Sequence, residues 1–397
     1  MYRAKMNFTV ATIIGILMLC AAIWLGSLKG IPLSYTTWMW IFFFYIIIAA
    51  AVPVNILLQP RDYLNSWLLY AGLLIGFLAA VFAFRGFEIP AFSSFSPILL
   101  GGKPTPFWPA IPLIIACGSL SGFHSLVASG TTSKQLTKES DALFIGYGAM
   151  FTEGFLSTIV IVSIAGFGYT ALQNAGVTAE TLNFGNWGAM FTKASASVKL
   201  SKANLFVQSY SDMVNATWLA FIPTKIVKII AGMWVASFAM TTLDTTNRLA
   251  RYCISEMALP LKESAAGFYS FLTNRWVASI IPAAIGIWLA ASGNWLIIWG
   301  SFGAANQLIA AIALMTGAAF AAKKLKSGFS SAAVIPAWLL WITVTCGIIW
   351  FIVVVQPGAI AAKPVPGWTV MVLLCVMLLL NFLFIWDFIK SKAYKVE

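Results

Sequence analysis

Long apolar runs separated by short polar stretches dominate the chain. Most runs reach the roughly 18 consecutive apolar residues that an α-helix needs to cross a bilayer. They predict an all-α polytopic membrane protein with ten membrane-spanning helices, at 8–26, 35–58, 64–84, 108–129, 142–168, 222–243, 276–292, 295–322, 334–355 and 367–389. An even number of spans places both termini on the same side of the membrane.

One segment breaks this alternation. Residues 169–215 are rich in Ala, Ser, Asn and Lys and contain no apolar run of spanning length. A connection of this length predicts a partly helical loop outside the membrane, on the extracytoplasmic side. The chain is therefore expected to divide into a first group of helices at 1–168, the loop at 169–215 and a second group at 216–397.

Composition agrees with the membrane assignment. Hydrophobic residues make up 60% of the chain and charged residues only 9%, whereas about 25% of a soluble domain is charged. The 24 Lys and Arg outnumber the 12 Asp and Glu, and most of the excess falls in loops on one side of the predicted spans. Because Lys and Arg accumulate in cytoplasmic loops, both termini are predicted to be cytoplasmic.

Several partner and cofactor classes are excluded at this stage. No basic cluster is dense enough to indicate a nucleic-acid partner. The five cysteines form no CxxC pair and the chain has one histidine, so neither a disulfide framework nor a metal site is predicted. We expect no cofactor other than a coupling ion, H⁺ or Na⁺.

The fourth predicted span, 108–129, carries an unusual density of Gly, Ser and Pro. Two structures fit it. In a straight interior helix its serine hydroxyls would bond back to carbonyls of the same helix. In a helix broken near mid-membrane, freed backbone groups would bind a solute, as in transporters. The second alternative is favoured, and the predicted substrate-binding residues are Cys117, Gly118, Ser119, Ser121, Gly122, His124 and Ser125.

His124 admits several roles. Its ordinary pKa would suit proton coupling, but a lone histidine is more often a structural group. Together with Ser121 or Ser125 it could also serve a membrane-embedded enzyme. No orienting acid or GxSxG motif accompanies these residues, so we do not expect an enzyme.

Two acidic residues lie within predicted spans or at their ends. Glu153 lies in the fifth span, where an acid marks an ion pathway or is a neutral, hydrogen-bonded group. Asp244 lies among Thr241, Thr245 and other polar residues. This cluster could bind Na⁺ or relay a proton, or Asp244 could cap a following helix and pair with Arg248. The ion-coupling candidates are Glu153, Asp244, Thr241 and Thr245.

Two further polar groups lie among apolar residues. Asn306 and Gln307 in the eighth span need partners, either another helix or a ligand, and are candidate pore-lining residues. The segment PRDYLNSW at 60–67 is interpreted as a rigid connector with a local ion pair.

Four segments resemble the carbon starvation protein A family of bacterial inner-membrane transporters. They are PRDYLNSW (60–67), the stretch from ACGSLSGFHSLVASGTTSKQL to FTEGF (116–155), LDTTNRLARY (243–252) and WGSFGAANQLIAAIAL (299–314), in the family's order. The resemblance implies a secondary transporter with a leucine-transporter-like inverted-repeat fold. It also implies proton-coupled uptake of peptides or pyruvate during carbon starvation across the inner membrane.

The same resemblance raises an alternative. Members of this family normally begin with further spans, including a Gly-rich helix, and this sequence starts after them. The chain would then be the C-terminal part of such a protein, or a non-transporting subunit that needs a partner supplying those spans in trans. The bilayer and a small organic solute are the other expected partners.

Overall fold

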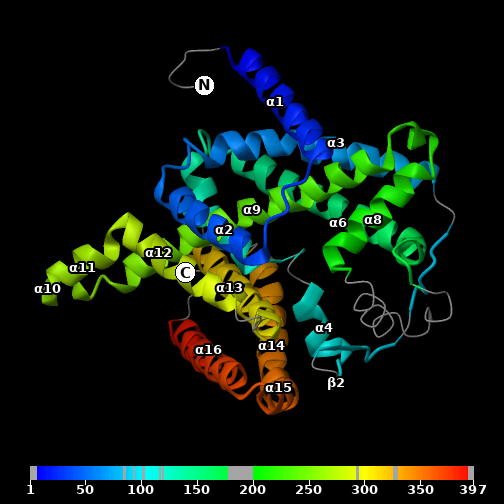
Figure 1. The fold of residues 1–397 in the computed structure, drawn as a ribbon. Coiled ribbons are helices and arrows are strands. Elements are labelled where there is room, and N and C mark those ends of the chain that lie inside the picture. The colour runs from blue at the N-terminus through cyan, green and yellow to red at the C-terminus, as the bar shows by residue number, and fades with distance from the viewer. Residues whose placement is uncertain are drawn as a thin grey trace. The chain divides into compact units, whose positions relative to one another are not determined.

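The computed structural model describes residues 7–83, 86–92, 94–100, 103–115, 118, 120–177, 200–291, 295–324 and 330–391. These residues form almost only helices (Figure 1). The one sheet in the described chain is a short antiparallel pair, β1 (Ile98–Leu100) and β2 (Lys103–Pro104). This confirms the predicted helical membrane class.

Seven helical segments of the described chain are long and apolar enough to cross a membrane. They are α1 (Phe8–Leu28), α3 (Leu58–Phe82), α6 (Asp141–Asn174), α9 (Thr224–Met257), Ser301–Lys323 within α13 (Trp295–Lys323), Ala332–Ala362 across α14 (Ser330–Trp350), η7 (Phe351–Val355) and α15 (Gln356–Ala362), and α16 (Pro364–Lys390). The bent pair α11 (Ala266–Thr273) and α12 (Arg275–Ala291), with a 66° angle, makes eight if it is one span. The predicted count of ten is therefore not confirmed.

Of the two remaining predicted spans, one is a helix shorter than expected and the other is interrupted. The span expected at 35–58 is α2 (Tyr35–Ala51), which has only 17 residues. It ends early because Pro53 disfavours helical geometry in the residue before it. The span expected at 108–129 is not one helix but α4 (Phe107–Ile115) followed by the short α5 (Gly122–Val127), the π-helical turn η2 (Ala128–Thr132) and the 3₁₀ turn η3 (Ser133–Gln135).

The described chain separates into two compact units. Unit 1 contains Met1–Phe92 and Phe155–Ala291, and unit 2 contains Ser93–Gly154 and Ser292–Glu397. This division differs from the sequence-based segments because each unit joins two stretches that are distant in sequence.

In unit 1 the core lies among α3, α6, α8 (Lys202–Asn215) and α9. Tyr210 of α8 is 2% exposed, and its hydroxyl donates to the Gly72 carbonyl of α3 at 2.7 Å. The ring of Trp234 from α9 lies against Gly72, where a β-carbon would be only 3.0 Å away. Glycine thus permits the close contact between α3 and α9.

Described residues of the segment expected as an outside loop pack in this core. α6 continues to Asn174, and α8 presents an apolar face with Leu205, Phe206, Met213 and Val214 buried. After α8 the chain forms the short η6 (Trp218–Phe221) and enters α9. Of the predicted loop at 169–215, the end of α6 to Asn174 and α8 are helical. Residues 178–199 lie outside the described chain, and the assignment of this segment as an extracytoplasmic loop stays a prediction.

In unit 2 the core lies among α4, α13, α14 and α16. Its apolar centre includes Leu113, Leu308, Val344, Ile348 and Leu374. Asn381 of α16 links to α14 by accepting from Trp341 Nε1 at 2.6 Å and donating to Thr345 Oγ1 at 2.9 Å. The buried amide of Asn381 therefore finds its partners on a neighbouring helix.

Candidate functional site

The first candidate site is a group of charged and polar side chains in unit 1 that joins α2, α3 and α9. Its members are Tyr45, Arg61, Asp62, Thr241 and Asp244, here called the charged cluster. At its centre Arg61 Nη1 donates to Asp244 Oδ2, although the two residues are 183 positions apart in sequence. The Arg61 side chain is 19% exposed and that of Asp244 is 1% exposed.

The other members complete this ion pair. Arg61 Nη1 also donates to the Tyr45 hydroxyl, which in turn donates to Asp244 Oδ2 at 3.0 Å. Arg61 Nη2 donates to Asp62 Oδ1 at 3.0 Å and to Thr241 Oγ1 at 3.1 Å. One guanidinium therefore serves two carboxylates, which its planar fork of donors permits.

The structure corrects one interpretation of residues 60–67 and confirms another. Residues 60–67 are not merely a connector, because they lie in the first turns of α3 and supply Arg61 to a buried pair. The expected local pair does form between Arg61 and Asp62 at 3.0 Å. No signal in the sequence identified Asp244 as the second partner, since nothing in the spacing relates α3 to α9.

Asp244 neither caps a helix nor pairs with Arg248, contrary to one alternative. It lies inside α9, which continues to Met257 instead of ending near 243. Arg248 is 3% exposed and uses Nη2 to bind the carbonyls of Ala49 at 2.6 Å and Val52 at 2.8 Å. It thereby caps the C-terminal end of α2, where a cation is favoured because the last carbonyls of a helix lack partners within the helix.

The predicted ion-coupling residues of this region lie on one stripe of α9. Thr241, Asp244, Thr245 and Arg248 follow the i, i+3, i+4, i+7 pattern that places residues on one helix face. Thr241 Oγ1 bonds with Asp62 Oδ1 at 2.9 Å, and Thr245 is buried. The structure therefore brings Thr241 into contact with the charged cluster and places Thr245 beside it.

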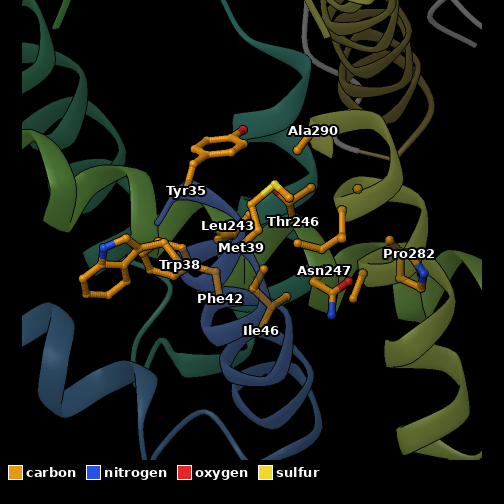
Figure 2. A pocket seen from close by; sticks show the side chains of 14 residues that line it. Tyr35, Trp38, Met39, Phe42, Ile46, Leu243, Thr246, Asn247, Pro282 and Ala290 are labelled. Carbon is orange, nitrogen blue, oxygen red and sulfur yellow. The ribbon is translucent and has the colours of Figure 1, made fainter. Parts of the chain in front are cut away.

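The neighbouring face of α9 lines an apolar cavity of about 460 Å³ between α2, α9 and α12 (Figure 2). This volume falls within the usual range for small-molecule pockets. Two polar residues of α9 reach it, but Thr246 Oγ1 donates to the Thr242 carbonyl at 2.6 Å and Asn247 Nδ2 to the Ser279 carbonyl at 3.1 Å. The cavity consequently suits an apolar group better than a charged one.

The second candidate site is the helix break in unit 2, the interruption between α4 and α5 that ends at Ser121. Ser121 has extended backbone angles, φ −110° and ψ 127°, and its side chain caps α5 by accepting from His124 N at 3.5 Å. Entry into α4 is also irregular, because Trp108 is not helical. These observations confirm the predicted broken helix over the straight one.

Packing of the helix break depends on Gly122. A β-carbon there would lie 2.1 Å from the Asn306 carbonyl oxygen and 2.5 Å from Ile309 Cβ. Both atoms belong to α13, so only glycine lets α5 approach that helix this closely. Gly118, by contrast, has open space where its β-carbon would lie.

Asn306 bridges α13 to the helix break. Its Oδ1 accepts from Phe123 N at 2.7 Å and from Ser121 Oγ at 3.2 Å. Asn306 is 3% exposed and Gln307 is fully buried. For Asn306 the packing alternative is thus supported, since its amide oxygen joins two protein segments.

The remaining predicted substrate-binding residues behave differently from one another. Ser125 Oγ donates to the Gly122 carbonyl at 2.6 Å, the back-bonding expected of the straight-helix alternative. Cys117 and Ser119 lie outside the described residues.

His124 and Glu153 approach each other in unit 2. His124 Nδ1 lies 3.7 Å from Glu153 Oε2, and their side chains are 54% and 37% exposed. The structure therefore brings a predicted substrate-binding residue beside a predicted ion-coupling residue. Among the described residues, no group of three or more His, Cys, Asp or Glu side chains is placed to hold a metal ion.

Comparison with known proteins identifies relatives over most of this chain. It is 30% identical to the "Peptide transporter CstA" of Bacillus subtilis (strain 168), over 99% of this chain and 68% of the relative. It is 27% identical to the "Pyruvate/proton symporter BtsT" of Escherichia coli (strain K12), over 83% of this chain and 54% of the relative. The "Peptide transporter CstA" of Escherichia coli (strain K12) is 28% identical, over 78% and 48%.

No solved structure matches the chain. The chain spans between about half and about two thirds of the length of the three relatives above. The family model "Carbon starvation protein CstA" matches residues 1–346. This match covers more than half of the chain and includes all four resembling segments, so the protein belongs to the carbon starvation protein CstA family.

Proposed function

We propose that this protein is a proton-coupled secondary transporter that takes up peptides or a small carboxylate such as pyruvate. The observation that carries the proposal is the buried Arg61–Asp244 pair, held between helices α3 and α9 that are long and apolar enough to span a membrane. Charged groups at such positions are costly, and in membrane proteins they mark ion and substrate pathways. The names of the relatives, a peptide transporter and a pyruvate/proton symporter, support the same class.

The solute is proposed to bind near the helix break, at Gly118 to Ser125. Both proposed solutes carry a carboxylate, and His124 offers an imidazole there that is charged when protonated. Backbone groups freed by a broken helix bind substrates in other transporters. Glu153, 3.7 Å from the imidazole, and Asp244 are the two candidates for the coupling carboxylate.

The fold is proposed to be the inverted-repeat fold of leucine-transporter-like proteins, in the bacterial inner membrane with both termini cytoplasmic. The excess of Lys and Arg in predicted cytoplasmic loops supports this orientation. Reporter fusions at each end, one active only in the cytoplasm and one only outside it, would test it. Activity of the cytoplasmic reporter at both ends is expected.

Transport is tested by reconstituting the purified full chain into proteoliposomes. Uptake of labelled pyruvate and of a labelled dipeptide is measured with and without an inward proton gradient. We expect at least one solute to accumulate above its external concentration when the gradient is present, and the accumulation to collapse with a protonophore. An inward Na⁺ gradient without a proton gradient serves as the control for the ion.

Either solute accumulating with the Na⁺ gradient alone would assign the coupling to Na⁺ instead. Absence of accumulation under every gradient would contradict the transporter proposal for this chain. Empty liposomes supply the background in each condition.

A further inference from the structure

The charged cluster contains more negative than positive charge. Two carboxylates, Asp62 and Asp244, share the single guanidinium of Arg61. The next cation along α9, Arg248, is directed to the carbonyls at the end of α2. The cluster therefore holds one negative charge that no cation within it balances.

This charge has a definite location. Asp244 Oδ2 receives hydrogen bonds from both Arg61 and Tyr45, whereas Asp244 Oδ1 is buried and has no hydrogen-bond partner in the described part of the chain. Asp62, by comparison, is 35% exposed and is bonded by Arg61 and Thr241. A buried carboxylate oxygen without a donor is costly, and binding a cation would remove that cost.

From this geometry we infer that the coupling proton binds Asp244 at Oδ1, and that Arg61 is an internal counter-ion which then remains with Asp62. The inference rests on the proposed function and assigns its coupling step to Asp244, not Glu153. The titratable and charged groups near Asp244 are Tyr45 of α2, Arg61 and Asp62 of α3, and Arg248 of α9.

Protonation changes how the helices are joined. With Asp244 charged, Arg61 ties α3 to α9 through an ion pair and Tyr45 adds α2. Once Asp244 is neutral, the guanidinium keeps its charged bond only to Asp62 and its neutral bond to Thr241. Proton binding thus replaces the Arg61–Asp244 ion pair between α3 and α9 by the Arg61–Thr241 hydrogen bond alone. The cluster therefore has a protonated and a deprotonated state, and a proton gradient can shift the balance between them.

The inference separates coupling from solute movement, so both are measured in proteoliposomes. Asp244→Asn mimics the protonated carboxyl and cannot release a proton. We expect this variant to lose accumulation driven by the proton gradient while retaining exchange of labelled internal for unlabelled external solute. Glu256→Gln, which changes an exposed carboxylate on the same helix α9, is the matched control and is expected to keep gradient-driven accumulation. Glu153→Gln tests the rival coupling carboxylate.

A second pair of variants tests the roles of the neighbours. Asp62→Asn removes the second carboxylate that shares Arg61, so the ion pair between Arg61 and Asp244 becomes stronger. A stronger pair favours charged Asp244, and the pH of half-maximal uptake should therefore fall. Tyr45→Phe removes a donor to Asp244 and keeps the ring, so half-maximal uptake should move to higher pH. Monodisperse elution and wild-type thermal unfolding establish that each variant is folded, and Tyr45→Phe keeps the test valid if Asp244→Asn does not fold.

The outcomes distinguish this inference from the proposed function. If the wild type shows no gradient-driven accumulation, the transporter proposal fails. If the wild type accumulates solute and folded Asp244→Asn does so equally, the inference is overturned although transport stands. Loss of coupling in Glu153→Gln with retention in Asp244→Asn would also overturn it and move the proton to Glu153. An unchanged pH profile for Tyr45→Phe would count against it as well.

Discussion

The charged cluster and the helix break are both polar regions among apolar helices, but different forces hold them together. The charged cluster joins side chains from α2, α3 and α9 by ionic hydrogen bonds. At the helix break a neutral amide, Asn306, binds a hydroxyl and a backbone N–H, and a glycine allows the contact. The comparison teaches that the contacts of the charged cluster depend on charge, which a proton can change. The contacts of Asn306 and Gly122 at the helix break depend on neutral hydrogen bonds and shape, which a proton does not change.

The largest effect should follow from adding one carbon to the helix break. In Gly122→Ala the β-carbon would lie 2.1 Å from the Asn306 carbonyl oxygen, so α5 and α13 must move apart. Overpacking of this kind should lower the free energy of unfolding by about 3 kcal/mol. Thermal unfolding in detergent and uptake in proteoliposomes measure the effect.

Gly118→Ala is the matched control, because its β-carbon would meet open space. It should unfold like the wild type. Equal stability of Gly118→Ala and Gly122→Ala would show that the close approach of α5 to α13 at Gly122 does not stabilise this region.

A slightly smaller effect is expected at the edge of the charged cluster. Arg248→Gln removes the cation that binds the carbonyls of Ala49 and Val52. Losing hydrogen bonds to a buried charge should cost about 2 kcal/mol of unfolding free energy. Arg251→Gln on the same helix, whose guanidinium lies over the Tyr252 ring at 4.7 Å, should cost less, and the reverse order in thermal unfolding would contradict the capping role.

The next effect tests the neutral bridge. Asn306→Ala leaves Phe123 N and Ser121 Oγ without the amide oxygen that accepts from them. An unsatisfied buried donor should lower the free energy of unfolding by about 1–2 kcal/mol. Uptake should fall at every pH alike, since no charge is altered. For the unfolding measurement, Ser125→Ala, which loses only a local bond, provides the control. A shift of the pH dependence of uptake in Asn306→Ala would contradict the claim that the contacts of Asn306 do not depend on charge.

The smallest effect concerns a carboxylate whose hydrogen-bond partners are amides. Asp212 of α8 accepts from Asn174 Nδ2 at 3.2 Å and Gln208 Nε2 at 3.3 Å, and burial raises the pKa of its carboxyl above the ordinary value. Since the folded state then holds the proton more tightly than the unfolded state, the protein should gain stability as pH falls through the raised pKa toward the ordinary value of a free carboxyl. Asp212→Asn should remove this gain and change stability by about 0.5 kcal/mol, as thermal unfolding between pH 4 and 7 would reveal. An unchanged slope in the variant would contradict this expectation.

Local sequence features predicted the helix break well. Ser121 and the prolines of 108–129 act on their own backbone, so their effect could be inferred without knowing any neighbour. The need for glycine at 122 depends on the approach of α13 and could not be inferred in this way. The partner of the break, Asn306, was recognised only as an amide that needed some partner.

The contacts within the charged cluster were predicted less well than the helix break. Asp244 and Thr241 were expected to act together in one alternative and Asp244 to pair with the α9 cation Arg248 in the other, but Arg248 in fact binds α2. Arg61 was interpreted as local because Asp62 adjoins it, and that pair does form. Its link to Asp244 depends on how α3 packs against α9, which no spacing within either helix contains.

The sequence by itself determined the membrane class, the positions of most long helices, the interruption near Ser121 and the family to which the chain belongs. These properties depend on transfer of apolar side chains into a bilayer, on backbone preferences and on common ancestry, and each can be assessed along the chain. Only the tertiary structure decided which charges meet, because a buried charge pairs with whichever partner the packing of distant helices brings within hydrogen-bonding distance.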